Sequence, residues 1–327
     1  MKNKTTKTPA TSAALPYPKK KRLTFTRDDM ELTMLALPTF VWYVIFMYLP
    51  MFGIIILFKQ YRIDGNGFIS SLLSSEWVGF ENFKFLFATD NTWIMIRNTV
   101  LYNIAFITLG IIVPVIFAIL MNEMLWRKFA KTCQTMMFLP YFLSWVVISY
   151  FVYAFLSPDK GLVNSMLVAM GFDKISWYTS PQFWPFILIF LNTWKFMGYN
   201  SVIYMASIAG FDKSMYEAAL IDGASKWQQV KYITLPLLKP IMIILFIMNV
   251  GNIFRSDIGI FWHVPKAQGA LRSVTETVDT YVYRAMTQIN DIGKSSAVNF
   301  VQSVIGCITI LVANGIVTKV DPDSAMF

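Results

Sequence analysis

Two long apolar stretches of the chain carry polar side chains at helical spacing. Asn192 and Tyr199 are seven residues apart and therefore lie on one face of a helix. Asn249 and Asn252, three residues apart, also share a face. Amides that bond hydroxyl groups, beside an aromatic face for the C–H side, suit a sugar. The pattern favours a sugar-binding cavity, and hydrogen bonding of each asparagine to a neighbouring helix is the alternative.

Lys195 and Phe196 lie near the Asn192–Tyr199 stripe. A lysine is unusual in a site for a neutral sugar, and an ionisable residue within an apolar segment is a candidate functional residue. Two interpretations stay open. Lys195 could attract an acidic substrate such as a uronate oligomer, or it could pair with a carboxylate of a partner chain.

Residues for covalent chemistry are scarce. The chain has one histidine, His263, so neither a histidine-based triad nor a histidine metal cluster is available within it. The two cysteines, Cys133 and Cys307, suit buried positions as small apolar residues. We expect a chain that is not an enzyme and that holds no metal or cofactor.

The amino-acid composition indicates the class of protein to which these residues belong. Of 327 residues, 14% are charged and 56% are hydrophobic, and the mean hydropathy is +0.51. An ordinary soluble domain has about 25% charged residues. The aromatic content of 16% argues against disorder. The class that remains is an all-α polytopic membrane protein.

Six uncharged or nearly uncharged stretches approach or exceed the ~20 residues that span a bilayer as a helix. They are residues 32–58, 98–122, 132–158, 182–209, 240–254 and 295–318. The fifth has only 15 residues and ends at Arg255, so its helix is expected to continue past that residue. Residues 275–286 have helical apolar spacing and form either an amphipathic helix at the outer surface or a lid packed on the bundle.

The net charge of +9 is unevenly distributed. Residues 1–27 hold eight Lys or Arg and no acidic residue, which leaves 20 − 19 = +1 for the rest. This pattern predicts a basic cytoplasmic tail over residues 1–31, a six-span domain over 32–320 and a short cytoplasmic C-terminus over 321–327. No base-reading module follows the tail, so nucleic acid is not an expected partner.

The loop between the fourth and fifth spans, residues 212–236, is predicted to form a cytoplasmic helix–bend–helix. Ser214 and Glu217 have capping-box spacing before a short helix that ends near residue 221. Gly223 follows in a bend, and a second helix is expected over 224–233. Such a pair could occupy a groove of a partner protein, or could simply connect two spans.

This loop resembles the EAA motif of permease subunits in bacterial ABC importers. The matching residues are Glu217, Ala218, Ala219, Gly223, Ile233, Leu235 and Pro236. Residues 77–83, 138–140 and 192–194 resemble the maltose-type carbohydrate permeases, and residues 278–284 resemble the polysaccharide and complex-oligosaccharide subgroup. The resemblance covers about residues 30–320.

The resemblance implies a function and a set of partners. Two permeases would form a heterodimeric pathway through the bacterial plasma membrane lipid, and an extracytoplasmic binding protein would deliver a complex oligosaccharide. Two separate ATPase subunits would bind ATP and Mg. The EAA helix would dock on one of them: Glu217 would make charged contacts, Gly223 would allow the bend, and Ala218 and Ala219 would permit close packing.

The resemblance also implies positions in the substrate pathway: Asn192, Phe196, Tyr199, Met248, Asn249 and Asn252. Small sugars or polyol phosphates are alternative substrates. A self-contained secondary transporter and a membrane-embedded enzyme are the alternative classes, and the EAA loop and the lack of clustered His, Asp or Glu in the spans argue against them.

Overall fold

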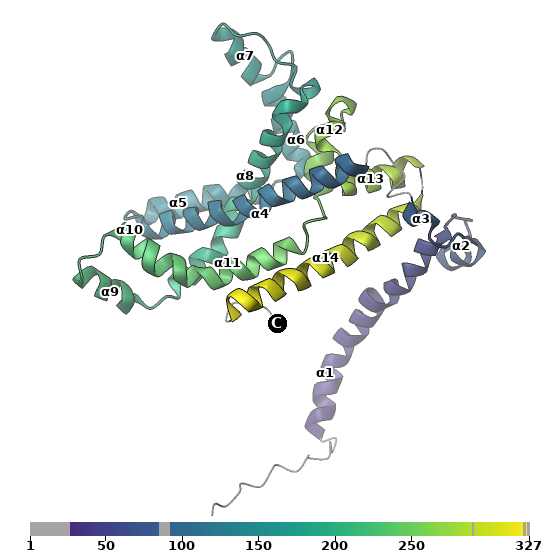
Figure 1. Ribbon diagram of the computed structural model, residues 1–327, viewed down its shortest axis with the longest axis horizontal. Coiled ribbons are helices and arrows are strands. Elements are labelled where there is room, and N and C mark those ends of the chain that lie inside the picture. The colour runs from purple at the N-terminus through teal and green to yellow at the C-terminus, as the bar shows by residue number, and fades with distance from the viewer. Residues whose placement is uncertain (1–26, 85–91, 290, 323–324, 326–327) are drawn as a thin grey trace, which may run out of the picture. The chain divides into compact units, whose positions relative to one another are not determined.

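The computed structural model describes residues 27–84, 92–289, 291–322 and 325 (Figure 1). These residues are almost entirely helical. Within the described part, strands are limited to the two-residue antiparallel pair β1 (Lys59–Gln60) and β2 (Glu76–Trp77). The chain separates into two compact units, residues 1–54 and 55–327, which are described one at a time.

The first unit consists of helix. It contains α1 (Arg27–Tyr43), the π-helical turns of η1 (Val44–Tyr48) and the start of η2 (Leu49–Phe58). Apolar side chains are exposed around it, and α1 buries none of its residues. A helix that is apolar on all sides requires apolar surroundings, as a bilayer provides. Residues 27–31, the end of the predicted tail, already belong to α1. Residues 1–26 of that tail lie outside the described part.

In the second unit, α4 (Thr92–Glu123) and α8 (Trp184–Ala209) pack against each other along much of their length. One core cluster unites Val115 and Ala118 of α4 with Tyr204 of α8 and with Leu238. Leu238 belongs to α11 (Leu235–Val250), which contacts α4 and also α14 (Ile292–Val320). Figure 1 shows α4, α11 and α14 running alongside one another.

The third predicted span, residues 132–158, is not one straight helix. The chain forms α5 (Arg127–Phe138), the 3-10 turn η3 (Leu139–Phe142) and α6 (Trp145–Leu156), with a bend of 103°. The Ser144 side chain accepts a hydrogen bond from the Val147 N–H and so starts a new helix at Trp145. The uncharged run over residues 132–158 continues across the bend, so the absence of charge could not reveal this break.

The fifth span differs from the prediction at both ends. One helix of 25 residues comprises α10 (Lys226–Gln229), the π-helical turn η6 (Val230–Thr234) and α11, so the second helix of the loop runs directly into the span. The wide turn η6 precedes Pro236, whose ring would clash with a regular preceding turn. The helix ends at Val250 and does not continue past Arg255.

Helical length and apolarity alone mark four spans and the bent pair: residues 27–58, 92–123, 226–250 and 292–320, with 127–156 bent. The remaining span is α8, whose 26 residues are long enough to cross a bilayer but include polar and aromatic side chains. The prediction of an all-α polytopic membrane protein is confirmed.

Short elements connect the spans. They are α2 (Phe68–Ser74), α3 (Glu81–Lys84), α7 (Leu162–Ala169), η4 (Trp177–Thr179), η5 (Pro181–Phe183), α9 (Lys213–Ile221), η7 (Gly259–His263), η8 (Gly269–Leu271), α12 (Arg272–Thr275), α13 (Val278–Arg284) and η9 (Ala285–Ile289). Val278 and Val282 of α13 are buried against Met95 and Val298. Of the two interpretations of residues 275–286, the structure supports the lid packed on the bundle.

Candidate substrate pocket and coupling loop

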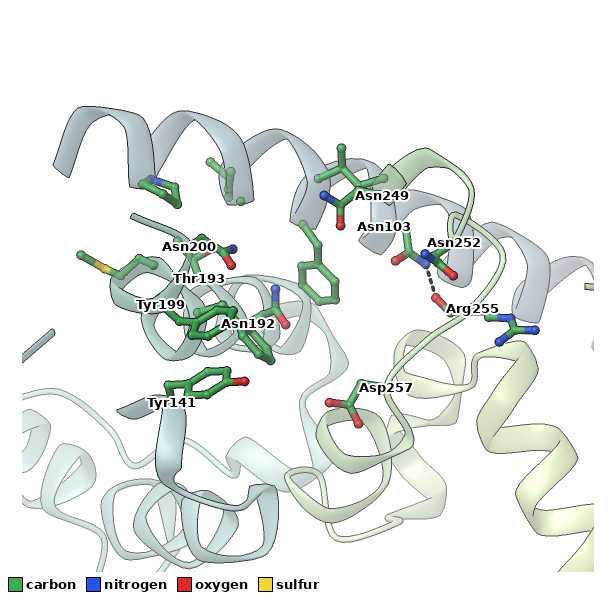
Figure 2. A pocket seen from close by; sticks show the side chains of 17 residues that line it. Asn103, Tyr141, Asn192, Thr193, Tyr199, Asn200, Asn249, Asn252, Arg255 and Asp257 are labelled. Atoms are coloured by element: carbon green, nitrogen blue, oxygen red, sulfur yellow. Dashed lines mark hydrogen bonds between the residues drawn. The ribbon is translucent and has the colours of Figure 1, made fainter. Parts of the chain in front are cut away.

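A pocket of about 380 Å³ lies between α4, η3, α8, the end of α11 and the segment that follows it. Its polar lining residues are labelled in Figure 2: Asn103, Tyr141, Asn192, Thr193, Tyr199, Asn200, Asn249, Asn252, Arg255 and Asp257. Apolar residues of α4 and α8 complete the wall. The combination of amides and aromatic rings in one cavity can bind a hydroxyl-rich ring.

Five residues predicted for the substrate pathway line this pocket: Asn192, Phe196, Tyr199, Asn249 and Asn252. Met248 and Lys195 are not among its lining residues. The predicted set did not contain Asn103, Tyr141, Thr193, Arg255 or Asp257; Asn200, a polar residue of the fourth predicted span, also lines the pocket. A sequence signal existed for Asn103 and Asn200, since both are amides within uncharged stretches; Tyr141 and Asp257 reach the pocket only through the tertiary fold.

The aromatic wall is built from two elements. The rings of Tyr141 on η3 and Tyr199 on α8 stack in parallel, with centroids 4.1 Å apart. Phe196 meets Tyr141 edge-on at 6.0 Å. Phe196 and Tyr199 are three residues apart on α8, so both can face η3. The bend of the third span places Tyr141 against α8 and gives the pocket this wall.

Lys195 holds the bend in place. Its side chain is 6% exposed, and its Nζ donates to the carbonyl oxygens of Pro140 (3.4 Å), Tyr141 (2.8 Å) and Leu143. It also lies 5.4 Å from the centroid of the Trp145 ring. An ammonium group has three N–H donors, and these three carbonyl groups engage them. In this structure Lys195 lies behind the pocket wall, with its ammonium group bonded to the carbonyl groups of the bend.

Gly198 allows α8 to approach the end of α5. A Cβ atom at this position would lie 2.0 Å from the Met137 carbonyl oxygen. No side chain larger than hydrogen fits at that distance, so the glycine is required by the close backbone contact. This contact joins the end of α5 to α8, and the Lys195 hydrogen bonds join the following η3 to the same helix.

Residues 251–257, which we call the rim segment, border the pocket and are anchored by three helices. The Asn103 amide donates to the carbonyl oxygens of Ile253 (2.9 Å) and Arg255 (2.8 Å). The Gln302 amide of α14 donates to the Phe254 carbonyl oxygen at 2.6 Å. These carbonyl oxygens accept hydrogen bonds from side chains instead of from backbone N–H groups of a continuing helix, which explains why the fifth span ends before Arg255.

Asp279 of α13 anchors the rim segment from the third side. Its Oδ2 accepts hydrogen bonds from the Ser256 N–H (2.5 Å) and the Ser256 hydroxyl (2.9 Å). Burial raises the pKa of the Asp279 carboxyl, although these bonds favour its charged form. The rim segment is thus held in one conformation.

Asn249 of α11 and Asn252 of the rim segment each donate to a carbonyl group of α11. The Asn249 amide donates to the Leu245 carbonyl oxygen at 2.7 Å, and the Asn252 amide donates to the Met248 carbonyl oxygen at 3.2 Å. Both side chains are exposed toward the pocket side of the chain. Among the described residues, neither side chain donates to another helix, whereas the Asn103 amide of α4 donates to the rim segment.

The predicted coupling loop forms a helix, a bend and a second helix, as expected, but its first cap was assigned wrongly. Helix α9 begins at Lys213, and the Asp212 carboxylate accepts from the Ser214 N–H at 2.9 Å. This bond holds the pKa of Asp212 below its usual value. Ser214 lies inside the helix, so the predicted Ser214–Glu217 capping box does not form. A capping box forms instead between Ser225 and Gln228 at the start of α10.

The remaining motif residues surround the bend. Gly223 has φ +81°, a conformation that favours glycine, and reverses the chain after α9. Glu217 and Ala218 are exposed, whereas Ala219 is half-buried. Ile233 and Leu235 are half-buried on the helix that follows, and Pro236 lies at the start of α11.

A second pocket, of about 490 Å³, adjoins α9 and includes Glu217 in its lining. Beside it, Lys226 and Glu123 form an ion pair of 3.1 Å that joins α10 to the end of α4. The ion pair thus connects the second helix of the loop to α4, whose other residues line the first pocket.

Comparison with known proteins agrees with this arrangement. Residues 110–314 match the family model described as "Binding-protein-dependent transport system inner membrane component". The polygalacturonan/rhamnogalacturonan transport system permease protein YteP of Bacillus subtilis is 32% identical over 98% of each chain. The arabinooligosaccharides transport system permease protein AraP of Halalkalibacterium halodurans is 31% identical over 63% of this chain and 65% of that one.

A solved structure agrees with the fold. The crystal structure of a bacterial ABC transporter involved in the import of the acidic polysaccharide alginate contains a chain that matches with a TM-score of 0.80 and 30% identity, over 90% of this chain and 97% of that one. With the helical spans and the coupling loop in place, these similarities show that the chain belongs to the binding-protein-dependent transport system inner membrane components, the permease subunits of ABC importers.

Proposed function

We propose that this chain is one half of the pathway of an oligosaccharide importer. The observation that carries the proposal is the pocket in which the Tyr141–Tyr199 pair faces the amides of Asn192 and Asn249. Stacked rings suit the C–H face of a sugar, and amides suit its hydroxyl groups. The open side of the pocket belongs to a second, homologous permease that completes the pathway.

The proposed substrate class is an acidic oligosaccharide, such as a short galacturonate oligomer. Support comes from relatives: YteP is named for polygalacturonan and rhamnogalacturonan, and the solved alginate importer has also been crystallised with an alginate pentasaccharide-bound periplasmic protein. An extracytoplasmic binding protein delivers the oligomer to the end of the bundle away from α9. Both termini lie in the cytoplasm.

The proposed energy source is a pair of cytoplasmic ATPase subunits that bind ATP and Mg. Helix α9 docks on one of them through Glu217, Ala218 and Ala219, while Gly223 permits the bend. ATP binding closes the ATPase pair, which moves α9 and α10, and the Lys226–Glu123 ion pair transmits this movement to α4. This chain itself performs no covalent chemistry.

Uptake by the reconstituted complex tests the proposal. The chain is co-expressed with the neighbouring permease, ATPase and binding-protein genes, purified and placed in liposomes that contain ATP on the ATPase side. Trigalacturonate should accumulate only with ATP and the binding protein present. A complex that assembles and hydrolyses ATP, but transports neither acidic nor neutral oligosaccharides, would contradict the proposed function.

A further inference from the structure

Asp257 is a carboxylate of the pocket lining for which the proposed function has given no role. It ends the rim segment, its side chain is exposed, and it is one of two charged residues in the lining. The other is Arg255, whose guanidinium donates to the Ser303 hydroxyl on α14 at 2.8 Å. In Figure 2 the Arg255 side chain points away from Tyr141 and Asn192. Among the described lining residues, the Asp257 carboxylate is therefore the charged group that is not turned toward α14.

The Asp257 carboxylate is held in a fixed orientation. Its Oδ2 accepts from the Trp145 indole N–H at 2.5 Å, and its Oδ1 accepts from the Gly259 backbone N–H at 2.7 Å. A Cβ atom on Gly259 would lie 2.3 Å from the Trp145 ring, so only glycine permits this arrangement. Trp145 is itself buried and lies against Lys195. The carboxylate is thus supported by the same cluster that holds the bend.

Two acceptor positions remain on this carboxylate. An ionised carboxylate has about four lone-pair positions, and the two bonds from Trp145 and Gly259 use one on each oxygen. One further acceptor position per oxygen therefore remains on a side chain that is exposed within the pocket lining. Two acceptors on neighbouring oxygens match two hydroxyl groups on adjacent carbons of a sugar ring.

We propose that Asp257 is a specificity-determining residue that accepts hydrogen bonds from a vicinal pair of sugar hydroxyl groups. The inference rests on the proposed function and names the part of the substrate that is read. In a galacturonate unit the O2 and O3 hydroxyls lie on the edge of the ring away from the carboxylate at C5. Asp257 can therefore bind the hydroxyl edge of an acidic sugar while the like charge of that sugar points away from it.

The test compares two substrates in the reconstituted importer: trigalacturonate and the same trimer methylated at O2 and O3. The variant is Asp257→Asn, which keeps an acceptor for Trp145 but replaces one carboxylate oxygen by an NH₂ donor. We expect it to lower kcat/KM for trigalacturonate by ~10-fold, as loss of a hydrogen bond to a charged group does. Import of the methylated trimer, already slow in the wild type, should not change further. Asp159→Asn, an exposed acidic residue outside the pocket lining, is the matched control.

The outcomes separate the possibilities. Equal loss of both substrates in Asp257→Asn would mean that the carboxylate only supports Trp145 and would overturn the inference. The inference would also be overturned if Asp257→Asn imported both trimers at the wild-type rate. It would be overturned as well if the wild type imported the methylated and the unmethylated trimer equally fast. If the wild-type complex imports neither trimer but does import neutral oligosaccharides, the inference fails and the importer function stands; if it imports no oligosaccharide at all, the proposed function itself fails. Basal ATPase activity, measured without substrate, should be the same in the wild type and in the Asp159→Asn control.

Discussion

The rings of Tyr141 and Tyr199 stack with an interplanar angle of 4° and a centroid separation of 4.1 Å. Tyr141 comes from the bend of the third span and Tyr199 from α8. Such a pair stabilises the contact by ~1 kcal/mol beyond its buried area. It also offers a flat aromatic edge to the pocket, so the shape of the pocket depends on a bend in a neighbouring helix.

Removal of the Tyr199 ring should impair transport without weakening delivery of the substrate. In Tyr199→Ala we expect the uptake rate of an oligosaccharide to fall ~10-fold, because the aromatic wall loses one of its two stacked rings. The affinity of the binding protein for the same sugar, measured by calorimetry, should be unchanged. Tyr199→Phe keeps the stacked ring and is the control. Normal uptake by the alanine variant would show that Tyr199 serves packing only.

Replacement of Lys195 should destabilise the bend. In Lys195→Met the side chain still fills the space, but the carbonyl groups of Pro140, Tyr141 and Leu143 lose their donor. A buried unsatisfied polar group costs about 1–3 kcal/mol, so the unfolding midpoint in detergent should fall by several degrees. Lys231→Met, at an exposed position, should leave it unchanged. A Lys195→Met protein with wild-type melting would contradict the role assigned to Lys195.

A methyl group at Gly198 should separate α8 from α5. Since the added Cβ would lie 2.0 Å from the Met137 carbonyl oxygen, Gly198→Ala must displace backbone, which cannot yield as a flexible side chain does. We expect a fall in thermal stability and in the amount of assembled complex. The matched control is Gly315→Ala on α14, where no atom lies within 4 Å of the added Cβ. Equal stability of the two variants would rule out the close approach.

Much of the fold can be predicted from sequence because the bilayer sets the length of its spans. Uncharged stretches located α4, α8 and α14 to within a few residues at most ends. The bend of the third span and the early end of the fifth could not be predicted. Each depends on hydrogen bonds from distant residues, Lys195 in one case and Asn103 in the other.

Some residues of the candidate site could be predicted from the sequence, and others could not. Asn192, Phe196 and Tyr199 could be found because helical spacing places them together on α8. Asp257 could not, since its orientation depends on Trp145, which is distant in the sequence, as well as on the nearby Gly259 N–H. The cap of α9 was missed because Asp212 and Ser214 are both good N-cap residues. Whether Asp212 or Ser214 caps the helix depends on where the chain leaves α8.

The turn that starts α2 should loosen in acid. Hydrogen bonds to the Asp64 carboxylate, from the Ser70 hydroxyl (2.7 Å), the Asn66 N–H (2.9 Å) and the Ser71 hydroxyl (2.8 Å), lower the pKa of Asp64 from 3.8 to about 2. Because the folded-state pKa is depressed, the stabilisation is present above pH 3.8 and is lost as the pH falls to about 2. Hydrogen exchange of α2, corrected for the intrinsic pH dependence, should rise over this range. In Asp64→Asn it should be high throughout; a wild-type profile in that variant would exclude this titration.

Reversal of the charge at Glu217 should uncouple the permease from its energy source. The side chain is exposed on α9 and is not needed for the cap of that helix, which Asp212 provides. Glu217→Lys should therefore fold and reach the membrane, yet bind the ATPase subunit weakly, because a lysine would face groups that accommodate a carboxylate. We expect uptake to fall by at least tenfold, and co-purification of the ATPase to fall with it. Lys213→Glu, a charge reversal in the first turn of the same helix, tests whether charge in general matters there. If Glu217→Lys transports normally with the ATPase bound, α9 couples through its apolar residues and not through Glu217.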